Sequence, residues 1–114
     1  MNLPSSVKIG HMRATVTHSK SLNAYGYSDY GKSEITLQEG MDGCLQFETL
    51  FHEIAHFAAW NAGIKLTPKN HQHIDVIMSG LLQALQDNPQ LTYCLAEHVV
   101  EVNKKENRDA KREQ

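Results

Sequence analysis

The amino-acid sequence predicts an α+β fold in which short strands come first and helices follow. As far as residue 38, apolar and β-branched residues alternate with polar ones, as they do in half-buried strands. From about residue 43 onward, apolar residues recur at steps of three and four, the pattern of amphipathic helices. Residues 38–43 include two glycines and an aspartate, so this segment separates the two patterns.

Three short strands are expected in the N-terminal part. Their alternating or β-branched residues are Val7 and Ile9, then Met12, Ala14 and Val16, and later Ile35 and Leu37. Residues 25–32 contain the glycines and the aspartate expected of tight turns, so this segment is expected to connect strands.

Three helices are expected next. The first begins around Asp42 to Leu45, and Gly63 supplies its stop. Thr67 is a good cap before Pro68, so the second helix should run over about 68–87. A third helix begins at Pro89. The apolar stripe of the second helix is expected to consist of Ile74, Ile77, Met78, Leu81, Leu82 and Leu85.

Length and composition exclude several classes of protein. A chain of 114 residues fits one domain, which we assign to residues 1–103, while residues 104–114 are expected to form a frayed or disordered charged tail. A net charge of −2 provides no basic field for nucleic acid phosphates. No segment approaches the ~20 apolar residues of a membrane span, and the start lacks the apolar run of a signal peptide. A soluble cytoplasmic protein without nucleic acid or membrane partners is therefore expected.

The segment 52–56, His-Glu-Ile-Ala-His, has the spacing of a zinc site on a helix. Residues four apart share one helical face, so His52 and His56 can direct a ring nitrogen at the same ion. Glu53 lies beside that ion, where its carboxylate can take a proton from zinc-bound water and pass it to a leaving amine. The pattern predicts one catalytic zinc ion for hydrolysis, with Glu53 as the general base.

A catalytic zinc ion usually has three protein ligands, so a third must come from elsewhere. The stripe of the second helix centres about 50° from His71, roughly 90° from Asp75 and about 110° from His73. This favours His71 as the third ligand. Asp75 is its alternative or a hydrogen-bond partner of the ligand, and His73 is a ligand alternative or a substrate contact. His98 is read as a structural histidine, and the spacing of His11 and His18 carries no argument.

The order of these motifs resembles small phage-encoded zincin-like metallopeptidases, which are distantly similar to the SprT-like and ImmA/IrrE groups. The resemblance covers roughly residues 7–92 and includes Gly-Tyr-Ser-Asp-Tyr at 26–30, Glu-Ile-Thr-Leu at 34–37 and the segment 48–56. It implies a minimal zincin-like fold, with short antiparallel strands packed on the metal-binding helix plus two further helices. It also implies an acidic third ligand where this chain has His71, and an edge strand that an extended peptide can join.

The expected activity is therefore hydrolysis of peptide or protein substrates, in the cytosol of the cell that a phage infects. A tetrahedral oxyanion needs a donor besides the metal, and Tyr25, Tyr27, Tyr30 or His73 can provide it. Nitrogen ligands and an open position suit zinc, although cobalt, nickel or iron bind similar donors.

Two other interpretations stay open at this point. A zincin-shaped module without catalysis can act by occupying a host or virion protein. A deformylase-like hydrolase would use Cys44 as a ligand, but Cys44 stands closer to His52 than that family's spacing allows. Cys44 is instead expected to be a small buried residue, and both it and Cys94 to be reduced thiols.

Overall fold

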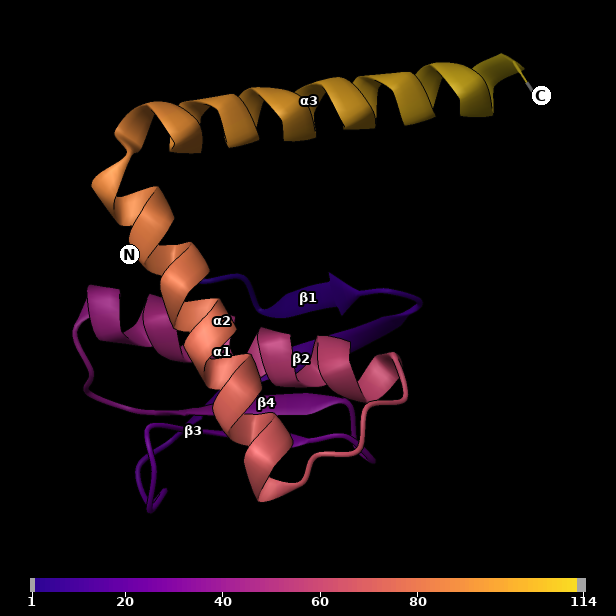
Figure 1. The fold of residues 1–114 in the computed structure, drawn as a ribbon. Coiled ribbons are helices and arrows are strands. Elements are labelled where there is room, and N and C mark those ends of the chain that lie inside the picture. Colours follow the sequence, from indigo (N-terminus) through magenta and orange to yellow (C-terminus); the bar gives the residue numbers. More distant parts are fainter. Residues whose placement is uncertain (1, 113–114) are drawn as a thin grey trace. The chain divides into compact units, whose positions relative to one another are not determined.

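The computed structural model describes residues 2–112 and has the α+β architecture that the periodicities predict (Figure 1). The strands are β1 (Ser6–Ile9), β2 (Met12–Ser19), β3 (Gly26–Asp29) and β4 (Glu34–Gln38). The helices are α1 (Gly43–Asn61), α2 (Pro68–Asp87) and α3 (Pro89–Arg112). The three expected strands and the starts of the second and third helices are confirmed.

The four strands form one mixed sheet in the order β1-β2-β4-β3. β1 pairs antiparallel with β2, and β3 pairs antiparallel with β4, but β2 and β4 are parallel. The expectation of antiparallel strands is therefore wrong for the central pair. The reason is topological: the chain reverses into β3 and again into β4, and β4 rather than β3 lies next to β2.

β3 was not expected, because residues 25–32 have the composition of turns. In the structure the turn is shorter and lies around Tyr30 to Ser33, where Ser33 has a positive φ of 51°. The amide of Lys32 donates to Oδ1 of Asp29 at 3.0 Å, which fixes the start of this turn. Pairing with β4 supplies the backbone hydrogen bonds of the preceding residues, and that long-range contact outweighs their weak strand propensity.

The sheet buries one face. α1 contacts β1, β3 and β4, and the core between them consists of Ile9, Ala14, Val16, Ile35, Leu37, Leu50 and Phe57. The strand residues that alternate with these are polar, and Thr17 shares hydrogen bonds with Glu34 and Thr36. The alternation of apolar and polar residues therefore places α1 on one defined side of the sheet.

α1 has well-defined ends. Oδ1 of Asp42 accepts a hydrogen bond from the amide of Leu45 at 2.9 Å, which caps the first turn. At the other end Gly63 has a φ of 79°, and the amides of Gly63 and Ile64 donate to the carbonyls of Trp60 and Ala59. This pair of bonds is a Schellman motif, which needs the left-handed conformation that glycine adopts without strain.

α3 extends farther than expected. Residues 104–112 are helical, so the prediction of a frayed or disordered tail is wrong for them, and residues 113 and 114 lie outside the described part. Lysine, glutamate, arginine and alanine are strong helix formers, and Lys104 pairs with Glu101 one turn earlier at 3.7 Å. Lys111 and Arg112 stand in the last turn, where positive charge favours a helix end.

The chain divides into two compact units, of which the first ends at Ser79 and the second begins at Gly80. The first unit contains the sheet, α1 and the beginning of α2, and the boundary between the two units lies within α2. Within residues 2–112, no helix combines the length and the apolar character needed to cross a membrane.

Gly26 allows β3 to approach α1 closely. A Cβ atom at position 26 would lie 2.6 Å from Cγ2 of Thr49, a distance that requires one element to move. We expect Gly26→Ala to lower the free energy of unfolding by about 1–3 kcal/mol, the usual cost of overpacking. Denaturant unfolding measures this, with Gly31→Ala as the control, because a Cβ there meets only Oδ1 of Asp29 at 3.6 Å. An equal effect of the two substitutions would contradict the close approach.

Candidate metal centre

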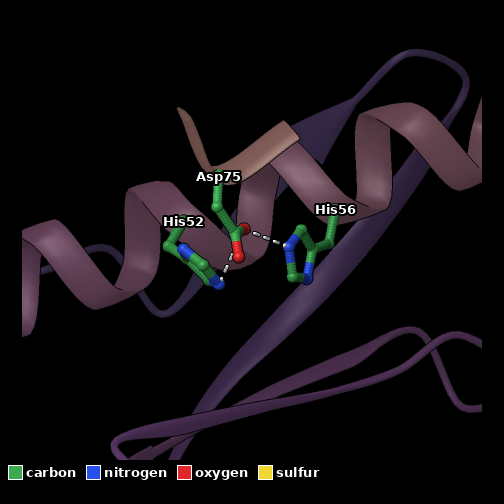
Figure 2. A group of neighbouring side chains, drawn as sticks. All are labelled: His52, His56 and Asp75. Carbon is green, nitrogen blue, oxygen red and sulfur yellow. Dashed lines mark hydrogen bonds and ion pairs between the residues drawn. The ribbon is translucent and has the colours of Figure 1, made fainter. Parts of the chain in front are cut away.

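Two histidines of α1 and one aspartate of α2 converge in the first unit. The rings of His52 and His56 have centroids 4.4 Å apart, and Asp75 reaches toward both of them from α2 (Figure 2). Nε2 of His56 donates to Oδ1 of Asp75 at 2.9 Å, and Nε2 of His52 lies 3.4 Å from the same oxygen. The three side chains can each offer one ligand atom, and these atoms all lie within 4.8 Å of one another.

This donor set fits zinc. Zinc binds imidazole nitrogen and carboxylate oxygen at about 2.0–2.2 Å in tetrahedral sites, so neighbouring ligand atoms stand roughly 3.4 Å apart. The two nitrogen–oxygen distances of 3.4 and 2.9 Å approach that spacing. Three protein ligands also leave one coordination position open, as a hydrolytic site requires.

The predicted ligands His52 and His56 are brought together, but the third member of the group is Asp75 rather than His71. His71 lies next to the group, with its ring centroid 4.6 Å from that of His56, and it lines the adjacent cavity without belonging to the group. His73 is exposed on α2 and is not a member either. The family resemblance implies an acidic third ligand at the position of His71, whereas the acidic member of this group, Asp75, stands one turn later.

Glu53 is buried beside the histidines, with only 7% of its surface exposed. The hydroxyl of Ser28 on β3 donates a hydrogen bond to its Oε2 atom. On the other side, a Cβ at position 26 would lie 3.5 Å from Oε1, so that oxygen faces a glycine. The carboxylate is thus held between α1 and the edge strand.

A cavity of about 560 Å³ opens next to Glu53 and His56. Its lining includes the whole of β3 and the following turn from Gly26 to Gly31, together with Leu66 and His71. The expected cleft beside the predicted general base is therefore present. Its volume lies within the range of about 300–1,000 Å³ that is usual for ligand sites.

The three candidate tyrosines differ in position. Tyr25 is 64% exposed and does not line the cavity, whereas Tyr27 lines it but is 58% exposed. Tyr30 lines the cavity and is half-buried, with its ring stacked on Trp60 at 5.3 Å and edge-on to Phe57 at 4.9 Å. Burial, and then the negative charges of Glu53 and Tyr27, raise the pKa of Tyr30 from 10.0 to about 12. Its phenol therefore keeps its proton at neutral pH and can donate to an oxyanion.

The raised pKa of Tyr30 predicts that the folded protein loses stability at alkaline pH. Between pH 10 and pH 12 the folded protein keeps a proton on Tyr30 that the unfolded chain loses. The corresponding stability is fully present below pH 10 and is lost as the pH rises through 12. We expect denaturant unfolding to show a smaller loss over this range in Tyr30→Phe than in the wild type. The control is Tyr25→Phe, which should behave like the wild type, and identical profiles of all three proteins would refute the assignment.

The structure also places residues that the sequence did not single out. Ser28 and Gly26 face Glu53 from β3, and these two small residues alternate with Tyr25 and Tyr27. That alternation is the available sequence signal, because a strand with one small-residue face can lie close to a helix. Because residues 25–32 have the composition of turns, this alternation alone does not predict a strand.

The remaining sequence candidates lie elsewhere. Cys44 is exposed at the start of α1 and outside the group, so the expectation that it is buried is wrong, and the deformylase-like ligand set is absent from residues 2–112. His11, His18 and His98 are exposed and do not belong to the group. No protein family model, curated protein or solved structure matches the chain.

Proposed function

We propose that this protein is a zinc-dependent metallopeptidase that hydrolyses a peptide or protein substrate. The observation that carries the proposal is the convergence of His52, His56 and Asp75 next to a buried carboxylate that borders an open cavity. A structural zinc site usually has four protein ligands, whereas this group offers three. The acid next to the group and the cavity favour hydrolysis over a purely structural metal.

Zinc bound by these three side chains would supply a Lewis acid that polarises a peptide carbonyl and makes water a better nucleophile at neutral pH. The chain's own residues carry the proton. Glu53 takes it from water as the oxygen bonds to the carbonyl carbon, and delivers it to the amide nitrogen as the carbon–nitrogen bond breaks. Water is thereby added across the peptide bond, and Glu53 returns to its ionised form.

Two side chains of the cavity can stabilise the oxyanion. Tyr30 keeps its phenolic proton, because its pKa is raised to about 12, and it lines the same cavity as Glu53. His71 also lines this cavity, next to His56, and can donate from a ring nitrogen. We assign the oxyanion contact to Tyr30 and an adjacent substrate contact to His71.

An extended polypeptide suits the cleft as a substrate. β3 lies at the edge of the sheet and pairs only with β4 among the described strands, so its outer edge can receive another strand. Main-chain hydrogen bonds along that edge would hold the substrate without regard to most of its side chains. We therefore propose unfolded or extended segments of proteins as substrates.

The test is hydrolysis of an unstructured protein by zinc-loaded and chelator-stripped samples. We expect cleavage only with the metal, and its recovery when zinc is returned. Binding should also stabilise the fold, by about 2.7 kcal/mol at a free zinc concentration 100 times the Kd. Elemental analysis of the purified protein identifies the metal, since iron also binds two histidines and a carboxylate. Cleavage that persists unchanged in the stripped sample would refute the proposal.

A further inference from the structure

We propose that Ser28 is a positioning residue, which holds the Glu53 carboxylate for proton transfer from the same strand on which the peptide docks. This inference rests on the proposed function, because the carboxylate has a catalytic role only if the protein hydrolyses peptides. The contact that carries it is the hydrogen bond from the Ser28 hydroxyl to Oε2 of Glu53.

The two oxygens of the carboxylate have different surroundings. Oε2 accepts a hydrogen bond from Ser28, whereas Oε1 faces Gly26, which has no side chain. Among residues 2–112, one buried side-chain nitrogen or oxygen lacks a hydrogen-bond partner. That atom is Oδ1 of Asn61, not Oε1 of Glu53. Because the hydrogen bond to this carboxylate goes to Oε2, Oε1 is not fully buried, and Glu53 lines the cavity. One oxygen is fixed, and the other is free to accept a proton.

The strand register shows where the main chain of Ser28 points. Neighbouring pairs of an antiparallel ladder alternate between hydrogen-bonded and non-hydrogen-bonded. The amide of Gln38 donates to the carbonyl of Tyr25 at 2.8 Å, and the register pairs Tyr27 with Thr36 and Ser28 with Ile35. Tyr27 is therefore in the next hydrogen-bonded pair, and Ser28 is in a non-hydrogen-bonded one.

It follows that Ser28 directs its N–H and C=O groups away from β4, toward the open edge of the sheet. Gly26, two residues earlier, does the same. A peptide added to this edge would bond to the main chain of Ser28, whose hydroxyl holds the general base. A single residue thus sets both the position of the peptide and the orientation of the carboxylate.

The alternative is a structural role only, in which the hydroxyl satisfies a buried carboxylate. The kinetics of two variants distinguish the two roles. Without the hydroxyl, Glu53 can rotate about its side-chain torsions, so we expect Ser28→Ala to lower kcat by about 10- to 100-fold. KM should change by less than about 3-fold, because the main-chain groups remain. Ser28→Thr keeps a hydroxyl and should retain most of the activity.

Two further variants complete the kinetic design. Because Ser28 acts through Glu53, the double variant Ser28→Ala/Glu53→Gln should be no slower than Glu53→Gln alone. Ser19→Ala removes a strand hydroxyl that bonds only to residue 21, and its activity should equal that of the wild type. Additive losses in the double variant would overturn the proposal.

A measurement without turnover tests the contact itself. In the zinc-free protein, the NMR signal of the Glu53 carboxyl carbon should shift in Ser28→Ala and stay in place in Ser28→Thr. An unmoved signal, or an unchanged kcat in Ser28→Ala, overturns the role of Ser28 while leaving the proposed function intact. Equal cleavage by the wild type and Glu53→Gln instead overturns the proposed function, and the role of Ser28 with it.

Discussion

Glu53→Gln is expected to slow peptide hydrolysis by about 10²- to 10⁴-fold, the usual contribution of a general acid–base group. Glutamine keeps the size of the side chain and can still accept a hydrogen bond from Ser28, but its amide does not take up a proton from water at neutral pH. The proposed ligands His52, His56 and Asp75 are untouched, so the zinc content should stay the same. Single-turnover cleavage of an unstructured protein, with elemental analysis of each sample, measures both quantities.

Glu48→Gln is the matched control. It makes the same chemical change on the same helix at an exposed residue, and its activity should lie within about 2-fold of the wild type. Loss of activity in both variants would point to a general effect of charge on α1. Full activity in Glu53→Gln would exclude this residue as the base.

The same variant distinguishes a peptidase from a non-catalytic binding module. A module that only occupies a partner should keep its biological effect in Glu53→Gln, because zinc and the surface around it remain. A peptidase should lose the effect along with the cleavage. The buried position of Glu53 next to a cavity supports the second outcome, because a binding module has no need of an acid there.

Much of the fold is encoded in local signals, which is why the sequence predicts it. Asp42, Thr67 and Gly63 are cap and stop residues whose hydrogen bonds involve chain neighbours within a few positions. The HExxH spacing is equally local, because one helical turn separates His52 and His56 whatever the remainder of the chain does. The positions of these residues on their helices therefore follow from the sequence without any tertiary contact.

The third member of the group depends on tertiary packing, whereas the apolar stripe of α2 favours a different residue, His71. That preference supposes that the whole stripe faces α1, but Ile77 is 63% exposed. Within residues 71–78 of α2, the half-buried or buried residues are instead His71, Ile74, Asp75 and Met78. Their centre lies roughly 40° nearer to Asp75 than the centre of the assumed stripe. That rotation is set by how α2 crosses α1, which the periodicity of one helix does not contain.

The position of the edge strand was not predicted, for a related reason. Residues 26–29 have few strand-forming side chains, and their pairing partner lies in residues 34–37. The close approach of β3 to α1 requires a glycine at position 26, and a glycine in isolation predicts a turn. The contact between Ser28 and Glu53 therefore becomes visible only once the sheet and the helix are assembled.

Asp75→Ala is expected to weaken zinc binding by more than about 100-fold, whereas His71→Ala should keep it within about 10-fold. Loss of a hydrogen-bond partner outside the ligand set already costs about 10- to 100-fold in metal affinity, so loss of one of three ligands should cost more. The carboxylate also supplies the only negative charge of the group, and its removal leaves two neutral imidazoles. Competition with a chromogenic chelator measures the affinity, and elemental analysis gives the stoichiometry.

His73→Ala is the control on the same helix, because His73 is exposed and outside the group, and its zinc affinity should equal that of the wild type. Circular dichroism of each zinc-free variant establishes that the helical content of the chain is unchanged, so that a loss of binding reflects a lost ligand. The reverse order, in which His71→Ala releases zinc and Asp75→Ala retains it, would make His71 the third ligand. Asp75 would then orient His56, from whose Nε2 it accepts a hydrogen bond. The metal would in that case lie closer to the cavity, between His56 and His71, than the three converging atoms place it.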